Sequence, residues 1–201
     1  PVFHLTAITH RKDPIYLTTI VGKPPQEDFY LGRATERIFL PLMRTQLPEI
    51  VDMDMPVEGV FHNCVIVSID KRYPMQSRRL MSALWGLGQM SFVKTIITVD
   101  SKIDVHNYHE LTKLLLDTIN FERDLFFSEG VLDVLNHGSD NMLYGSKLGI
   151  DLTEKVKGEP GYGENKSTAW NSSPFPSKEE AKNQFPDLKD CRILDINAQR
   201  S

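Results

Sequence analysis

The chain has 201 residues, of which 40% are hydrophobic and 25% are charged, with a formal net charge of -4 and a pI of about 5.9. These values are typical of a globular protein with one sizeable core and room for part of a second. The basic surplus that neutralises phosphates is missing, so we do not expect nucleic acid as a partner. No apolar run approaches the roughly 18–20 residues of a membrane-spanning helix. Cys64 and Cys191 form neither a disulfide framework nor a CxxC site, which favours a reducing cytoplasm.

The first 28 residues resemble the interior of a longer protein. Pro1 is preceded by no initiator methionine, basic region or signal cleavage site. Val2–Thr9 and Ile15–Val21 are rich in β-branched residues, and the turn-like run His10–Pro14 separates them. The pattern predicts a hairpin or two neighbouring strands. We expect that any catalytic group lies upstream of residue 1.

An amphipathic helix is predicted over Leu31–Leu47, within a linker and connector at residues 29–56. Its apolar residues recur with a period near 3.6, at Leu31, Ala34, Ile38 and Leu42 and again at Thr35, Phe39 and Met43. Pro41 should kink or split the helix. The proline-bounded stretch that follows carries four carboxylates, which a solvated acidic connector explains better than a catalytic pair: Glu49, Asp52, Asp54 and Glu58.

Strand and helix patterns alternate after residue 57, which favours an α/β fold. The expected elements are a strand, a helix, a strand, a helix and a short strand, at Val60–Ile69, Ser77–Leu87, Val93–Val99, Asn107–Ile119 and Asp124–Ser128. Both helices are long enough to be crossovers, so we predict a parallel or mixed sheet that is buried on both faces. Its central strand would be Thr95–Val99, and the domain would span residues 57–150.

The composition changes beyond residue 151, where glycines and prolines are scattered among polar residues. We expect an extended tail over residues 151–201, with a short helix at Ser177–Phe185 and an apolar ending at Ile193–Ile196. A tail of this kind often packs on a partner subunit.

Few side-chain patterns predict chemistry. His106 and His109, near Asp100 and Asp104, could share a helix face as a metal pair, but a polar helix cap explains them better. Gly86–Gly88 lies at a helix end, so a C-cap explains it better than a phosphate loop. Three methionines at near-helical spacing are core candidates before they are cofactor contacts: Met75, Met81 and Met90.

A series of ordered sequence blocks resembles the UbiD family of decarboxylases, the 3-polyprenyl-4-hydroxybenzoate carboxy-lyases and their relatives. The blocks are Pro1–Phe3, Thr9–Tyr16, Gly22–Asp28, Leu40–Pro41, Leu47–Asp52, Pro56–Gly59, Trp85–Met90, Glu122–Asp124 and Gly145–Asp151. They occur in the family's order and approximate spacing from residue 1 to about residue 155. The tail after Gly158 adds nothing to the resemblance.

The resemblance implies prenylated FMN as the cofactor and reversible decarboxylation of aromatic or unsaturated acids as the reaction. It also implies a divalent metal (Mn) and a monovalent cation (K) that hold the cofactor phosphate. In the family an Arg and a pair of acidic residues do the proton and carboxylate chemistry, and they lie upstream of the segment that matches Pro1. We therefore expect no catalytic or metal residue in this chain, and no activity from it alone.

The family pattern assigns the remaining roles. Residues 1–28 match the last strands of a split, flavin-binding β-barrel, where Thr19, Ile20 and Pro24 would approach the isoalloxazine. The helix matches a linker, and residues 57–150 match a C-terminal α/β domain that closes over the active site and builds the dimer. Thr118 matches a position whose backbone carbonyl helps to bind the monovalent cation. The expected walls of the substrate pocket, for which ordinary core positions are an equal alternative, are Met90, Phe92, Val131, Leu132 and Leu135.

Two functions remain open at the level of sequence. In the first, the chain is the C-terminal portion of a decarboxylase that acts on a polyprenyl-hydroxybenzoate or another quinone precursor. In the second, it is a non-catalytic oligomerisation or binding subunit of a split enzyme. Both predict self-association and contact with the upstream domains. A lipophilic substrate would add peripheral contact with a membrane.

Overall fold

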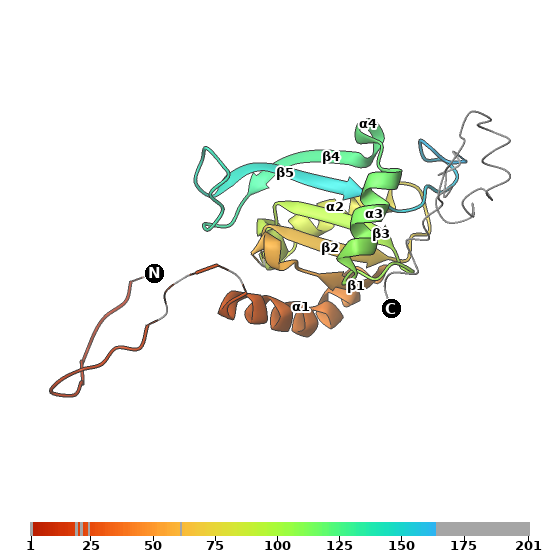
Figure 1. Cartoon of the computed structure of the whole chain (residues 1–201). Coiled ribbons are helices and arrows are strands. Elements are labelled where there is room, and N and C mark those ends of the chain that lie inside the picture. The colour runs from red at the N-terminus through yellow and green to blue at the C-terminus, as the bar shows by residue number, and fades with distance from the viewer. Residues whose placement is uncertain (1, 19, 21, 24, 61, 164–201) are drawn as a thin grey trace, which may run out of the picture. The chain divides into compact units, whose positions relative to one another are not determined.

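The computed structural model describes residues 2–18, 20, 22–23, 25–60 and 62–163. It contains an α/β domain with one sheet of five strands, ordered β1-β2-β3-β5-β4 (Figure 1). The strands are β1 (Ile50–Asp54), β2 (Cys64–Ile69), β3 (Thr95–Asp100), β4 (Leu125–Val131) and β5 (Tyr144–Asp151). The helices are α1 (Glu27–Gln46), α2 (Gln76–Trp85), α3 (Tyr108–Thr118) and the short α4 (Phe121–Asp124), with 3-10 turns η1 (Val57–Gly59) and η2 (Gly88–Phe92).

The sheet is mixed, and its three inner strands are parallel. β3 pairs with β2 on one side and with β5 on the other, which confirms Thr95–Val99 as part of the central strand. β1 and β4 pair antiparallel at the two edges. The prediction that the fifth element, Asp124–Ser128, joins a parallel series is therefore wrong. β4 pairs antiparallel with β5 over seven residue pairs. The segment with α3 therefore connects the end of β3 to the start of β4 at the same end of the sheet, and it is not a crossover between parallel strands.

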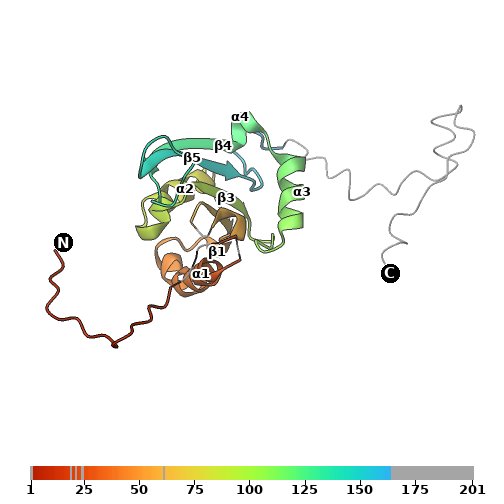
Figure 2. The same cartoon turned by 60° about the vertical axis from the view of Figure 1, so that its left-hand side comes forward.

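Side chains alternate between two buried layers, as expected for a sheet covered on both faces. Val65, Val67 and Ile69 of β2 face the core that α2 fills with Leu80, Met81 and Leu84. Ile66 faces the smaller core built with Val99, Val105 and Leu111 of the α3 side. Figures 1 and 2 show α2 and α3 on opposite faces of the sheet and α1 beside β1.

Helix ends follow the local chemistry of the sequence. The Asn107 side chain caps α3 by accepting a hydrogen bond from the Glu110 amide at 3.2 Å. Gly86 is the C-cap of α2, as predicted from its position. Of the three methionines expected in the core, Met81 and Met90 are buried, whereas Met75 is 45% exposed.

The linker helix α1 is continuous through Pro41, although the proline removes one helical hydrogen bond. The helix therefore does not split as predicted. Its buried residues are Gly32, Glu36 and Met43. The apolar positions Leu31, Ile38 and Leu42 are each about 60% exposed. The charged side of α1 thus packs on the domain while much of its apolar stripe faces outward.

The sequence patterns did not predict two of the strands, β1 and β5. β1 lies in the stretch expected to be a solvated acidic connector, and three of its neighbouring carboxylates, Glu49, Asp52 and Asp54, form ion pairs. Asp54 and Glu49 are buried, so that expectation is wrong for them. β5 was missed because glycines weaken strand patterns. Gly149 suits the close packing there, since a Cβ at this position would displace the buried Met81 side chain.

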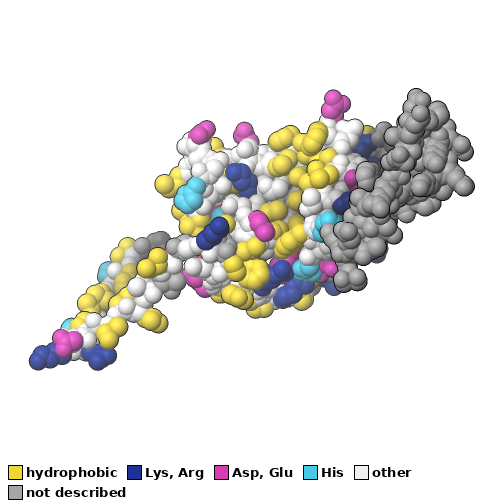
Figure 3. Space-filling model, viewed as in Figure 1, with side chains coloured by type: hydrophobic (Ala, Val, Ile, Leu, Met, Phe, Trp, Pro, Cys, Tyr) yellow, Lys and Arg dark blue, Asp and Glu magenta, His cyan; other side chains and the backbone are white. Residues whose placement is uncertain are grey.

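The N-terminal strand prediction is wrong for the described residues. Residues 2–18 form no strand, and their apolar side chains are exposed. A hairpin of two strands is marginal by itself and needs further strands or a packed face to persist. Figure 3 shows these hydrophobic side chains along the segment that precedes α1.

The segment that follows β5 packs on the domain, whereas the sequence predicts an extended tail from residue 151. Leu152, Thr153 and Glu159 are buried, and residues 157–163 form turns rather than an extended strand. The predicted helix at Ser177–Phe185 and the apolar ending at Ile193–Ile196 lie outside the described residues.

Candidate functional site

A cavity of about 610 Å³ lies between α1, the end of β1, the turn before β2, the η2 turn and the loop after β4. Its walls are mainly apolar and come from these five separate parts of the chain. They are lined by Thr35, Glu36, Phe39, Leu42, Met43, Gln46, Met53, Met55, His62, Leu87, Gly88, Gln89, Met90, Phe92, Val93 and Asp133. A hollow of this size and character is typical of a site for a small organic ligand.

The η2 wall brings two predicted pocket residues into the cavity. Met90 is 9% exposed and Phe92 is 38% exposed, and both line the hollow. The turn begins at Gly88, whose positive φ of 50° suits glycine. It is closed by hydrogen bonds from the Met90 amide to the Leu87 carbonyl (3.0 Å) and from the Val93 amide to the Met90 carbonyl (3.2 Å). The geometry agrees with a wall role for both side chains.

The other three predicted pocket residues occupy different places. Leu132 is 1% exposed and borders a second hollow of about 240 Å³ between the β4–β5 hairpin and its loop. Val131 and Leu135 are about half exposed and do not line the large cavity. Their neighbour Asp133 does line it, a residue that sequence reasoning did not select.

His62 is the second cavity residue that sequence reasoning missed. It follows a turn in which Val60 has φ 47° and ψ 49°, a left-handed conformation that is costly for a β-branched residue. The His62 amide donates to the Val60 carbonyl at 2.7 Å. Burial lowers the pKa of His62, and the negative charge of Asp133 opposes this only in part. The imidazole is therefore neutral at neutral pH and adds a polar but uncharged group to an apolar hollow.

Glu36 is the third ionisable group of the cavity wall, and its contacts are structural. Its carboxylate accepts hydrogen bonds from the Met55 amide at 2.8 Å and from Arg33 at 3.1 Å. Arg37 lies 3.4 Å from the same carboxylate. These contacts attach α1 to the end of β1 and so fix one side of the cavity.

An ionic cluster beside the cavity fastens α1 to the domain. The buried Asp54 carboxylate binds Arg33 and accepts a hydrogen bond from the Tyr108 hydroxyl at 2.7 Å. His106 lies between Asp54 (3.0 Å) and Asp52 (3.3 Å), so it belongs to this cluster and not to a pair with His109. Burial opposes ionisation of Asp52, but the hydrogen bond from Arg37 lowers its pKa. Burial and the Asp54 contact raise the pKa of Tyr108.

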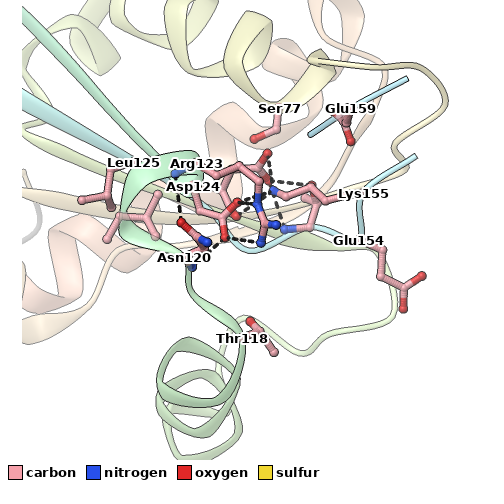
Figure 4. A network of polar contacts seen from close by, with 12 residues as sticks. Ser77, Thr118, Asn120, Arg123, Asp124, Leu125, Glu154, Lys155 and Glu159 are labelled. Carbon is pink, nitrogen blue, oxygen red and sulfur yellow. Dashed lines mark hydrogen bonds and ion pairs between the residues drawn. The ribbon is translucent and has the colours of Figure 1, made fainter. Parts of the chain in front are cut away.

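A second ionic network lies where β3 and β5 end (Figure 4). Asp124 is 2% exposed and accepts hydrogen bonds from Arg123 and from the Asn120 amide, both at 2.9 Å. Lys155 bridges Asp124 (3.0 Å) and Asp151 (2.9 Å). Burial opposes ionisation of Asp124, yet these donors lower its pKa to about 2.

The same network holds the chain after β5. The buried pair Lys71–Glu159 has an N–O distance of 2.6 Å, and Glu159 also accepts from the Met75 amide at 2.6 Å. Burial opposes ionisation of Glu159, but the hydrogen bond from Lys71 lowers its pKa. The carboxylates of this edge are neutralised by neighbouring cations, so the network stabilises the fold and offers no acid or base for chemistry.

Two of the four predicted cofactor residues, Ile20 and Thr118, lie within the described residues. Thr19 and Pro24 lie outside the described residues, and Ile20 is 86% exposed. Thr118 ends α3, where its hydroxyl donates to the Leu114 carbonyl at 2.8 Å, and Figure 4 shows it beside the ionic network without a contact to it. Within the described ranges, no group of three or more His, Cys, Asp or Glu side chains is suited to hold a metal.

The described residues also provide no activated thiol. Burial, with smaller effects from Asp54 and Glu58, raises the pKa of Cys64 to about 12, which keeps it protonated and unreactive. No helix in the described part of the chain is long and apolar enough to cross a membrane.

Comparisons with known proteins agree on one family. Residues 29–152 match the model of the 3-octaprenyl-4-hydroxybenzoate carboxy-lyase C-terminal domain, and residues 1–24 match the Rift-related domain of the same enzyme. An uncharacterized protein of Archaeoglobus fulgidus is 48% identical over 160 residues, which cover 79% of this chain and 33% of the relative. One of Aquifex aeolicus is 51% identical over 162 residues, covering 81% and 33%. The chain thus spans about a third of these curated relatives.

Solved structures share the fold at low identity. The open form of vanillic acid decarboxylase from Sedimentibacter hydroxybenzoicus, with a truncated ShVdcD, has a TM-score of 0.67 at 22% identity and covers 90% of this chain and 38% of that one. The UbiD-class enzyme HmfF from Pelotomaculum thermopropionicum, in complex with FMN, has a TM-score of 0.57 at 21% identity and covers 74% and 31%. On the match of its residues 29–152, the chain belongs to the UbiD family of carboxy-lyases.

Proposed function

We propose that this chain is the C-terminal part of a prenylated-FMN-dependent decarboxylase that releases CO₂ from an aromatic acid. A polyprenyl-hydroxybenzoate or a naphthoate-type precursor of ubiquinone or menaquinone is the substrate class we favour. The observation that carries the proposal is the apolar cavity at η2, in a domain that matches the family over residues 29–152. Met90 and Phe92, which the family pattern selects, both line it.

The role that we assign to this chain is to bind and desolvate the substrate. Phe39, Met90 and Phe92 offer flat or flexible apolar surface to an aromatic ring. Excluding water from a carboxylate favours decarboxylation, because its localised charge passes to a delocalised carbanion as CO₂ leaves. The neutral His62 would hydrogen-bond a polar ring substituent in this mainly apolar space. Proton transfer and electron withdrawal belong to groups outside this chain.

The cofactors are a proposal from the family alone. When bound, prenylated FMN supplies the electron sink for decarboxylation. Neither Ile20 nor Thr118 is arranged around a flavin, and the described residues contain no metal site. We propose that the Mn ligands and most K ligands lie in other parts of the enzyme, and that the Thr118 backbone carbonyl is the K ligand of this chain.

A non-catalytic oligomerisation or binding subunit is the second candidate. The exposed apolar positions of α1, Leu31, Ile38 and Leu42, favour it because such a surface is usually covered by another chain or domain. We propose self-association into a homodimer or higher oligomer for both candidates. We also propose a cytoplasmic enzyme, with peripheral membrane contact where the substrate is lipophilic.

The test compares the chain alone with the chain joined to its upstream region, each expressed with a source of prenylated flavin. The chain alone should show no flavin absorbance and release no CO₂. The longer protein should show both, across a panel of hydroxybenzoates and naphthoates. Carbon dioxide release by the chain alone would contradict the division of roles. A longer protein that binds flavin but decarboxylates none of these acids would favour the binding subunit.

A further inference from the structure

A buried lysine lies behind the η2 wall and takes no part in either ionic cluster. Lys147 of β5 is only 3% exposed. Its ammonium donates to backbone carbonyls, those of Ser91 at 2.6 Å and Val93 at 2.9 Å. Burying an ammonium is costly, and apolar residues usually replace it unless it makes a specific contact. The feature to explain is why a charge stands at this place.

The two carbonyls lie where η2 ends. Helical turns leave their last carbonyls without internal partners, and a cation is favourable there because of the direction of the peptide dipoles. The Trp85 indole donates to the same Val93 carbonyl at 3.0 Å, and the ammonium lies 5.8 Å from the centre of the Trp85 ring. Lys147 and Trp85 thus hold one end of the turn from two sides.

The rest of the domain leaves room for the lysine. A Cβ at Gly130 of β4 would lie 2.9 Å from the Lys147 Cε, so the glycine provides the space for the stem. The groups that touch the lysine from its neighbours are the indole on α2, the carbonyls of the η2 segment and this glycine on β4. The Lys147 side chain therefore extends from the sheet to the η2 segment of the cavity wall, where its ammonium makes its hydrogen bonds.

We propose that Lys147 is a positioning residue that fixes η2, and through it Met90 and Phe92, in the shape that the cavity requires. The proposal rests on the proposed function for the identity of the ligand, but not for the position of the turn. Removal of the Lys147 amino group frees the Ser91 carbonyl and loosens the turn while the sheet keeps its own pairing.

The first test compares hydrogen exchange in the full chain with that in Lys147→Met. The amides of Met90 and Val93 should exchange at least tenfold faster in the variant. Lys94→Met is the matched control, because Lys94 reaches only the Asn136 side chain and the Gly138 carbonyl, both at 3.4 Å. Exchange that is equal in Lys147→Met and in the unsubstituted chain would overturn the proposal.

The second test needs no change at Lys147. In the Trp170→Phe background, Trp85 is the only tryptophan. Its emission should change with a midpoint near the Lys147 pKa, which burial lowers to about 8. Slower exchange of the Met90 and Val93 amides, after correction for base catalysis, should accompany it, because the neutral amine keeps N–H donors and no longer buries a charge. If Lys147→Met does not fold, this series decides, and a flat emission and exchange profile between pH 7 and 9.5 overturns the proposal.

Binding of 1-naphthoate separates the inference from the proposed function. We expect Lys147→Met to bind it at least tenfold more weakly than the unsubstituted chain and Lys94→Met to bind it equally well. If naphthoate binds but neither exchange nor affinity depends on Lys147, the inference fails alone. If η2 depends on Lys147 but no aromatic acid binds, the positioning role stands and the proposed ligand class fails.

Discussion

The two sides of this domain treat polar groups in opposite ways. The edge where β3 and β5 end buries Asp124, Lys155 and Asp151 in a network of matched charges. The cavity at η2 is lined mainly by apolar side chains and encloses about 610 Å³. In the first region the buried charges have partners of opposite charge within the domain, whereas the second region is a hollow with room for a ligand. Substitutions should therefore change stability at the ionic edge and ligand binding at the cavity.

The largest effect is expected for Asp124→Asn. Removing one partner from a buried ionic network takes one carboxylate away from Lys155 and from Arg123, at a cost of up to about 3–5 kcal/mol in the free energy of unfolding. Urea unfolding measures this. Asp117→Asn is the control, since its exposed pair with Lys113 should contribute less than about 1 kcal/mol. Equal effects at both sites would remove the distinction between edge and surface.

The same carboxylate makes the stability depend on acid pH. The pKa of Asp124 is about 2 in the fold and 3.8 without it, so its contribution is present above pH 4 and is lost as the pH falls towards 2. A difference of this size corresponds to about 2 kcal/mol. The stability gap between the unsubstituted chain and Asp124→Asn should narrow over this range and stay constant above it.

Lys147 should make the stability depend on pH in the alkaline range. Burial lowers its pKa from 10.5 to about 8, so the unfolded chain binds the extra proton between these values. Stability should therefore rise with pH from 8 to 10.5, by up to about 3 kcal/mol relative to Lys147→Met. Thermal or urea unfolding at matched pH values measures the difference. A gap that stays flat with pH would mean that the ammonium is not buried as described.

At the cavity, Phe92→Ala should weaken aromatic-acid binding about tenfold, or about 1.4 kcal/mol, because it removes half-exposed wall surface. The free energy of unfolding should change by less than the free energy of binding. Phe127→Ala is the matched control, since Phe127 is 69% exposed on β4 and does not line the cavity. Titration of 1-naphthoate into both variants measures the contrast, which disappears if the ligand binds elsewhere.

The smallest expected effect tests the strained turn ahead of His62. Val60→Gly should stabilise the chain by up to about 1 kcal/mol, since glycine tolerates φ 47°. Val51→Gly, at nearly the same exposure but within β1, should destabilise it by a similar amount. Urea unfolding compares the two. Equal signs would show that Val60 is not strained.

Much of the domain interior was predictable because its signals are local. The apolar run Thr95–Val99 predicts the central strand, and Asn107 and Gly86 mark helix ends through hydrogen bonds within a few residues. β1 and the ionic clusters were not predictable. Asp54 has the pattern of a solvated acid until Arg33 and Tyr108, which are distant in sequence, are placed beside it. His62 and Asp133 line the cavity from loops, and sequence patterns in loops do not indicate which residues are neighbours in space.

The inverted packing of α1 has a consequence for how sequences of this kind can diverge. Ion pairs with Arg33 and Arg37 are directional, so they fix the rotation of the helix about its axis and its position along the sheet. Leu31 and Ile38 are exposed on the opposite side, where apolar contacts are not directional. Separate residues therefore set the orientation of α1 and the apolar surface that it exposes. Substitutions at Leu31 or Ile38 can change that surface without moving α1 or the cavity wall, to which α1 contributes Phe39, Leu42 and Met43.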